Sequence, residues 1–136
     1  MAYTVFISHG WHDRWIAARM ADQIVKAGGS PFIDIFDIKK GDRIEECVQR
    51  GLREAVELVA FLTPHSVGRN WVWSEISAAW ILGKRTVGVL YGVTIDEIEQ
   101  NHGGMATLRS TNVIAIDDFD AYIEELADRI DAETGR

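Results

Sequence analysis

The chain has 136 residues, a length that fits one domain with a single sizeable core. Its net charge of −7 argues against a nucleic-acid-binding surface, which would be basic and clustered. The single cysteine, Cys47, excludes a disulfide framework, and no Cys/His set has the spacing of a zinc site. No apolar run approaches membrane-spanning length, and no signal segment opens the chain. We therefore expect a cytoplasmic protein with no metal, no nucleic-acid partner and no membrane partner.

Strand-like and helix-like segments alternate along the chain. Short runs rich in β-branched and aromatic residues predict strands at 3–7, 30–35, 56–62, 85–91 and 112–116. Apolar residues at helical spacing predict helices at 13–27, 42–52 and 70–80, a short one at 94–100, and a last one capped by Asp118. Pro31 favours an edge position for the second strand, and the tail from residue 132 is expected to fray.

This alternation is typical of a parallel sheet covered by helices on both faces. We predict an α/β fold, a flavodoxin-like three-layer sandwich whose five-stranded parallel sheet has the order 2-1-3-4-5. In that order the ligand crevice lies at the carboxyl ends of the first and third strands. Those ends are Ser8-His9-Gly10 and Thr63-Pro64-His65-Ser66, so we expect the functional site there.

The helix expected after the third strand carries a lone carboxylate on an apolar stripe. Asn70 is a good N-cap residue for this helix. One predicted face carries Val72, Ile76, Ala79 and Trp80, and the other carries Trp71, Glu75, Ala78 and Leu82. Because burying an unpaired charge is costly, Glu75 must reach water, meet a donor or take part in chemistry. Pairing with Arg69 or Lys84 at the surface is the simpler alternative, but the closeness of the crevice favours a functional role.

Several nucleotide-binding classes are excluded by the residues after the first strand. That loop, Ser8-His9-Gly10-Trp11-His12, is neither a G-x-G-x-x-G fingerprint nor a P-loop, and it is not a flavodoxin phosphate loop. A phosphoacceptor receiver would need acidic residues there and an aspartate at the end of the third strand, where Thr63 stands.

Three motifs in register resemble those of the Toll/interleukin-1 receptor (TIR) domain family. Val5-Phe6-Ile7-Ser8-His9 is similar to its first box, a strand ending in F-I-S-[HY]. Phe32-Ile33-Asp34, followed by Ile38-Lys39-Lys40-Gly41-Asp42, resembles its second strand and BB loop. Trp71-x-x-x-Glu75 resembles the W-x-x-x-E signature of its enzymatic members. The resemblance runs over about residues 3–130, so residues 1–136 are interpreted as one TIR-like domain.

The resemblance implies one of two functions. Some family members are non-catalytic scaffolds that act by self-association or partner binding. Others cleave NAD⁺ at the nicotinamide–ribose bond, giving nicotinamide with ADP-ribose or a cyclic ADP-ribose isomer. Glu75 occupies the position of their catalytic glutamate, which favours an NAD⁺ glycohydrolase or ADP-ribosyl cyclase. NAD⁺ would be the substrate, no cofactor would be needed, and homo-oligomers would form through TIR–TIR contacts. A role in bacterial immune or stress signalling, as in antiphage defence, is also expected.

Further site residues follow from the same resemblance. Substrate binding is expected of five residues: Ser8, His9, Asp34, Phe36 and Trp71. The alternatives are that Ser8 only bonds local backbone and that Trp71 only packs in the core. The BB loop residues Ile38, Lys39, Lys40 and Gly41 are expected to gate the site or to dock a neighbouring copy. His65 is interpreted as structural, and His12 and His102 as solvent-exposed.

The proposed chemistry explains why one glutamate can suffice. Cleavage of an N-glycosidic bond passes through an oxocarbenium-like state, as in glycoside hydrolysis. Nicotinamide is already a cationic leaving group, so no general acid is required, and one carboxylate can stabilise the developing positive charge. A second enzymatic alternative is a different N-glycosidic enzyme of related fold that acts on nucleosides or nucleotides.

Overall fold

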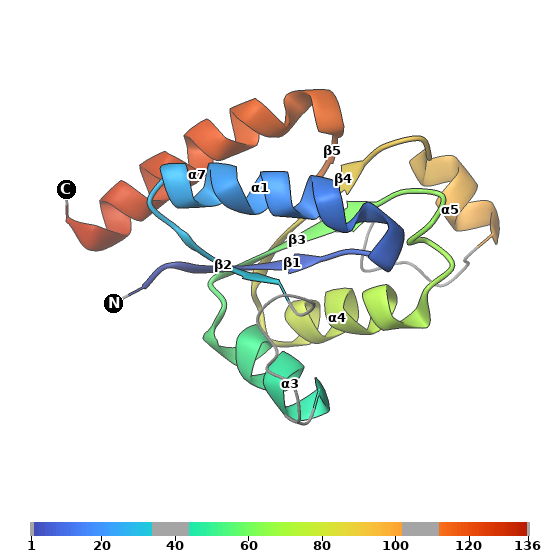
Figure 1. The fold of residues 1–136 in the computed structure, drawn as a ribbon, viewed down its shortest axis with the longest axis horizontal. Helices are drawn as coiled ribbons and strands as arrows, with labels where there is room; N and C mark the ends of the chain where they lie inside the picture. The colour runs from blue at the N-terminus through green and yellow to red at the C-terminus, as the bar shows by residue number, and fades with distance from the viewer. Residues whose placement is uncertain (1, 34–43, 102–111, 136) are drawn as a thin grey trace.

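The computed structural model describes residues 2–33, 44–101 and 112–135, and their strands form one parallel sheet (Figure 1). The strand order is β2-β1-β3-β4-β5. The strands are β1 (Thr4–Ser8), β2 (Ser30–Ile33), β3 (Glu57–Leu62), β4 (Arg85–Leu90) and β5 (Asn112–Ala115). The predicted fold class and strand order are therefore confirmed, and β2 lies at a sheet edge, as Pro31 indicated.

Helices cover both faces of the sheet and complete three layers. Figure 1 shows α1 (Arg14–Lys26) and α7 (Phe119–Thr134) on one face, and α3 (Ile44–Glu54) and α4 (Asn70–Ile81) on the other. The short α5 (Ile95–Asn101) follows β4. Two single-turn helices, η1 (Trp11–Asp13) and η2 (Ile116–Asp118), lead into α1 and α7.

Each helical layer encloses its own apolar core. The core under α1 and α7 includes Val5, Ile7, Ile24, Val59, Phe61, Val89, Leu126 and Ile130. The core under α3 and α4 includes Phe6, Leu52, Leu58, Leu62, Val72, Trp73, Ile76 and Ile98. β3 supplies side chains to both cores and is buried at every position, which is typical of a central strand in a parallel sheet.

Three details of the helices differ from the sequence prediction. α4 begins at Asn70, but Arg69 occupies the N-cap position with extended backbone, one residue earlier than predicted. Trp80, expected on the buried stripe, is 54% exposed, because it lies near the end of α4 and beyond the residues that pack on the sheet. The tail expected to fray is helical through Thr134, and Gly135, with a φ of 76°, ends the helix.

A buried carboxylate links α7 to the sheet at the amino-terminal ends of the strands. Glu57, the first residue of β3, is 1% exposed and accepts hydrogen bonds from the hydroxyl groups of Tyr3 and Tyr122. Arg129 on α7 binds the same carboxylate with two nitrogens, at 2.7 and 2.9 Å. Burial alone would raise the pKa of Glu57, but the bonds from Arg129, Tyr3 and Tyr122 outweigh it and lower the pKa. This cluster therefore lies at the amino-terminal ends of the strands, whereas the crevice was predicted at their carboxyl ends.

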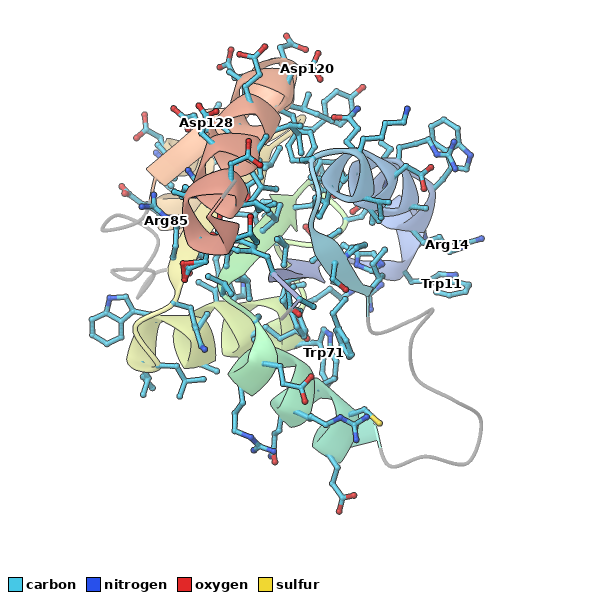
Figure 2. The ribbon with its side chains drawn as sticks, turned by 90° about the vertical axis from the view of Figure 1, so that its left-hand side faces the viewer. Trp11, Arg14, Trp71, Arg85, Asp120 and Asp128 are labelled. Carbon is cyan, nitrogen blue, oxygen red and sulfur yellow. The ribbon has the colours of Figure 1, made fainter. Side chains whose placement is uncertain are left out.

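The helices in the described part of the chain lack the length and apolar character needed to cross a bilayer. The longest of them, α7, has 16 residues and carries acidic side chains along its exposed face, including Asp120 and Asp128 (Figure 2).

Candidate functional site

A serine and a glutamate meet where the crevice was predicted. Ser8 is the last residue of β1, and Glu75 lies in the second turn of α4. The Ser8 hydroxyl donates a hydrogen bond to Oε1 of Glu75 at 2.5 Å, and the two residues are 1% and 3% exposed. Surface pairing of Glu75 with Arg69 or Lys84 is therefore wrong, and so is a Ser8 that bonds only local backbone.

The packing of α4 explains how a charged residue comes to be buried here. Val72, Ile76 and Ala79 are fully buried and hold the helix against the sheet. Glu75 precedes Ile76 by one residue, which turns its side chain toward the end of β1 instead of toward solvent. The sequence showed Glu75 as the one charge on an apolar stripe of this helix. Its carboxylate faces the carboxyl end of β1, where the crevice was predicted.

A polar contact that the sequence did not reveal joins the two loops at the carboxyl ends of β1 and β3. The Thr63 hydroxyl donates to Oδ2 of Asp13 at 2.7 Å, and it accepts a bond from the backbone N–H of His65 at 3.1 Å. Ser66 is fully buried, donates to the Phe61 carbonyl at 3.0 Å and accepts from the Thr63 N–H at 2.9 Å. The Thr63–Asp13 bond joins the loop after β3 to the segment after β1, whereas the bonds of Ser66 lie within the end of β3 and its own loop.

A glycine makes this close approach of the two loops possible. A Cβ atom on Gly10 would lie 3.3 Å from the Cβ of Ser66, tighter than ordinary packing. The sequence offered one signal for this arrangement, the small polar residues at the two strand ends. Asp13 was interpreted only as the start of a helix, and its partner lies 50 residues away.

Histidines gather at the same edge. His9 directly follows Ser8 and is 3% exposed. His12 and His65 are both exposed, and their rings stack with centroids 4.8 Å apart and planes 15° apart. The predicted exposure of His12 is confirmed, and its ring contacts that of His65.

The tryptophans of the W-x-x-x-E segment have different environments. Trp71 is 40% exposed, so the alternative that it only packs in the core is wrong. Trp73 is the buried one, and its Nε1 donates to the Val67 carbonyl at 2.8 Å. Outside this segment, Trp11 is exposed beneath the guanidinium of Arg14, 4.0 Å from the ring centroid (Figure 2).

The other predicted site residues lie outside the described residues. These are Asp34 and Phe36, expected to bind substrate, and the BB loop residues Ile38, Lys39, Lys40 and Gly41. His102 also lies there. Their assignments stay predictions.

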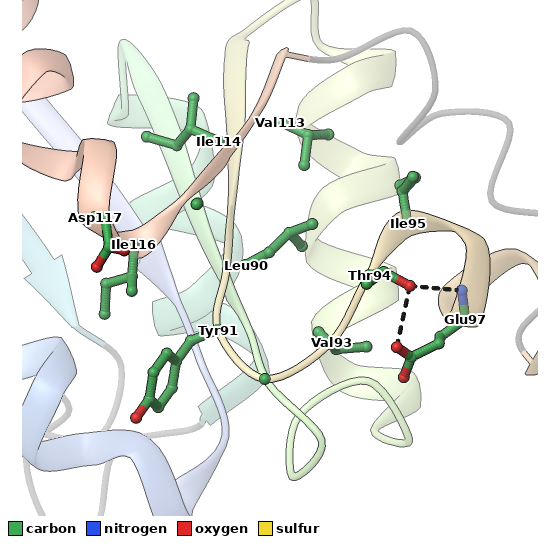
Figure 3. Close-up of a pocket in the computed structure, with 12 residues that line it drawn as sticks. Leu90, Tyr91, Val93, Thr94, Ile95, Glu97, Val113, Ile114, Ile116 and Asp117 are labelled. Carbon is green, nitrogen blue, oxygen red and sulfur yellow. Dashed lines mark hydrogen bonds between the residues drawn. The ribbon is translucent and has the colours of Figure 1, made fainter.

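A separate hollow of about 530 Å³ lies at the carboxyl ends of β4 and β5 (Figure 3). Apolar side chains such as Leu90 and Val113 line it, together with Tyr91 and Asp117. Thr94 caps the amino-terminal end of α5. Its hydroxyl accepts a hydrogen bond from the backbone N–H of Glu97 and donates one to the Glu97 carboxylate. The lining comes from β4, β5, the segments that follow them and the start of α5, not from the strand that carries Ser8.

The fold and the carboxyl ends of the strands together define a class, an open α/β sandwich with a buried serine–glutamate contact at the end of β1. The sequence model described as "TIR domain" matches residues 5–128. The chain therefore belongs to the TIR domain family.

Two curated relatives match part of the chain. One is the "Probable 2' cyclic ADP-D-ribose synthase BdTIR" of Brachypodium distachyon, 28% identical over 93 residues, which cover 67% of this chain and 42% of the relative. The other is the "NAD(+) hydrolase PdTIR" of Paracoccus denitrificans strain Pd 1222, 24% identical over 101 residues, which cover 71% of this chain and 34% of the relative. The matches thus span less than half of either relative.

A solved structure supports the fold independently. The TIR domain of the Toll-related receptor TRR-2 from Hydra magnipapillata superimposes with a TM-score of 0.66 at 18% identity. The match covers 89% of this chain and 90% of the Hydra domain.

Proposed function

We propose that this chain cleaves NAD⁺ at the nicotinamide–ribose bond and that Glu75 is the essential carboxylate. The observation that carries the proposal is the contact between Ser8 and Glu75, which holds a buried carboxylate at the crevice edge of the sheet. The names of the two relatives, an NAD(+) hydrolase and a cyclic ADP-D-ribose synthase, support NAD⁺ as the substrate.

The geometry suits the electrostatic role of this carboxylate. Bond cleavage leaves positive charge on the ribose, and a fixed negative charge in a site sheltered from water stabilises it more than bulk solvent does. The Ser8 hydroxyl orients one oxygen of Glu75, which limits the reorganisation needed during the reaction. Attack by water then gives ADP-ribose, and attack by a hydroxyl of the substrate itself gives a cyclic isomer.

The test is release of nicotinamide from NAD⁺ by the wild-type protein and by Glu75→Gln. The variant keeps the shape of the side chain but loses its charge, so we expect its rate to fall at least about 100-fold. Glu124→Gln, at an exposed position of α7, is the matched control and should react like wild type. Undiminished release by Glu75→Gln would refute the assignment, and mass spectrometry of the products separates ADP-ribose from cyclic isomers.

We further propose that activity depends on self-association through TIR–TIR contacts. If a neighbouring copy completes the site, the rate per molecule will rise with protein concentration or with an agent that promotes assembly. A rate per molecule that is independent of concentration would contradict this. A role in immune or stress signalling, and a cytoplasmic location, stay predictions.

A non-catalytic interaction module is the second candidate. It is favoured by the exposed apolar residues at the end of α4, where Trp80, Ile81 and Leu82 are 54%, 75% and 48% exposed. A contact with another protein would cover these apolar side chains. Absence of nicotinamide release under assembling conditions, together with loss of self-association in Ile81→Glu, would favour this candidate. A substrate panel of nucleosides and nucleotides tests the further alternative of another N-glycosidic enzyme.

A further inference from the structure

The stacked pair of imidazoles at the crevice has no role in the function proposed above. His12 comes from η1, directly after β1, and His65 comes from the loop after β3. Their rings lie nearly parallel, with centroids 4.8 Å apart. Both side chains are exposed, so the pair stands at the surface of the edge where Ser8 and Glu75 meet.

This pair is held in place by the framework beneath it. Asp13, the neighbour of His12, accepts the hydrogen bond of Thr63, and Thr63 in turn accepts the backbone N–H of His65. The two imidazoles are thus set side by side by contacts that do not involve the rings.

An anionic ligand at this pair would depend on the N–H donors of the rings themselves. The chain carries a net charge of −7, so an anion must be met by local donors. The carboxylate of Asp13 is buried and engaged by Thr63. The guanidinium of Arg14, one residue beyond Asp13, lies over the Trp11 ring and donates to the Trp11 carbonyl at 3.0 Å.

We infer that His12 and His65 form a binding site for the diphosphate group of the substrate, a proposal that rests on the proposed function for the identity of the ligand. A neutral imidazole offers one N–H donor and an imidazolium offers two. Two parallel ring edges from the two loops can therefore donate to oxygens of one phosphate or of two linked phosphates. The diphosphate would be held at the rim while the nicotinamide–ribose bond reaches inward to Glu75.

The direct test is titration of the protein with inorganic pyrophosphate, followed through the imidazole C–H resonances. We expect the His12 and His65 signals to shift together and to saturate. His12→Phe and His65→Phe should each weaken pyrophosphate binding about tenfold, because each keeps an aromatic ring but removes the N–H donors of the imidazole. Both positions are exposed, and thermal melts followed by circular dichroism check that the variants are folded.

Arg85→Gln is the matched control for general electrostatics. Arg85 is exposed and begins β4, so it lies at the amino-terminal ends of the strands, away from the histidine pair. Removing its charge should leave pyrophosphate binding within about twofold of wild type. Equal weakening by Arg85→Gln and the histidine variants would overturn the proposal, as would resonances of His12 and His65 that do not move.

A second comparison separates this inference from the proposed function. Nicotinamide riboside contains the same scissile bond but no phosphate. The histidine variants should raise KM for NAD⁺ about tenfold with little change in kcat, and should leave cleavage of nicotinamide riboside unchanged. Equal losses on both substrates would overturn the phosphate site. Pyrophosphate binding that depends on His12 and His65 without any nicotinamide release would keep the site and refute the proposed function.

Discussion

Oε1 of Glu75 lies 2.5 Å from the Ser8 hydroxyl, although 67 residues separate the two in the sequence. The contact joins the end of β1 to the second turn of α4. A carboxylate this deeply buried requires a donor, and Ser8 supplies one to it. The contact thus orients Glu75, while the buried apolar side chains of α4 hold the helix on the sheet.

The Ser8→Ala variant tests that contact. A hydrogen bond to a charged group is worth about 1.5–3 kcal/mol, so the free energy of unfolding should fall by about that amount. If the bond also orients Glu75 for catalysis, kcat/KM for NAD⁺ should fall about 10- to 100-fold. Chemical denaturation measures the free energy of unfolding, and nicotinamide release measures kcat/KM.

Ser74→Ala is the matched control for this variant. Ser74 is on the same helix, but it is exposed and its hydroxyl bonds only the Asn70 carbonyl. Its loss should change stability by less than about 0.5 kcal/mol and leave kcat/KM as in wild type. A Ser8→Ala protein as stable and active as Ser74→Ala would show that the contact is unimportant.

The bond between Asp13 and Thr63 is expected to couple the two loops energetically. Asp13→Ala and Thr63→Val should each destabilise the protein, because each leaves a buried polar partner without its bond. A double-mutant cycle should give a coupling energy of about 1–2 kcal/mol. Asp22→Ala is the control, since the ion pair of Asp22 with Arg19 is exposed and should contribute less than about 0.5 kcal/mol. Additive effects of the two changes would contradict the coupling.

Much of the fold could be predicted because its signals are local. The strands are short β-branched runs, and the helices between them have apolar residues at regular spacing, as in Ile44, Cys47, Val48 and Leu52 of α3. Alternation then restricts the topology to a parallel sheet, which places the crevice without any further information. Glu75 was noticeable for the same reason, since a charge interrupts an otherwise apolar stripe.

The contacts between loops could not be predicted in this way. Asp13 and Thr63 are 50 residues apart and belong to no periodic pattern, and His12 and His65 pair only because those loops meet. Trp71 and Trp73 are chemically alike, and their different exposures depend on how α4 lies against the sheet. Pairings of this kind arise from tertiary packing, which a single sequence does not encode in its local spacing.

The cluster around Glu57 should contribute strongly to the free energy of unfolding, because it links α7 to β3. In Arg129→Met, a buried carboxylate loses its bidentate cation, and the free energy of unfolding should fall by about 3 kcal/mol or more. Adding Glu57→Gln to this variant should restore part of the loss, because no unpaired charge then remains in the core. Arg19→Met, at an exposed ion pair on α1, is the control and should cost less than about 0.5 kcal/mol. Equal losses in the two arginine variants would refute a special role for the cluster.

The same cluster predicts a loss of stability in acid. The pKa of Glu57 is lowered below its ordinary value of 4.5 in the folded protein, so the unfolded chain binds a proton first as pH falls. The stabilisation is present above that ordinary pKa and is lost as pH falls through the lower pKa of the folded state. Denaturation measured over this range should show a shallower slope in Glu57→Gln than in wild type. Parallel slopes would show that other carboxylates carry the acid dependence.

A second loss of stability is expected in alkali, with the opposite sign. Burial, together with the hydrogen bond to Glu57 and its negative charge, raises the pKa of Tyr3 from 10.0 to about 12. Between these two values the unfolded chain has lost the tyrosine proton and the folded protein still holds it, so stability falls as pH rises. Tyr3→Phe removes this titration and should flatten the slope of the free energy of unfolding above about pH 10. Tyr91→Phe, at an exposed position after β4, should leave the slope as in wild type, and the same slope in all three proteins would show that the Glu57 cluster does not hold this proton.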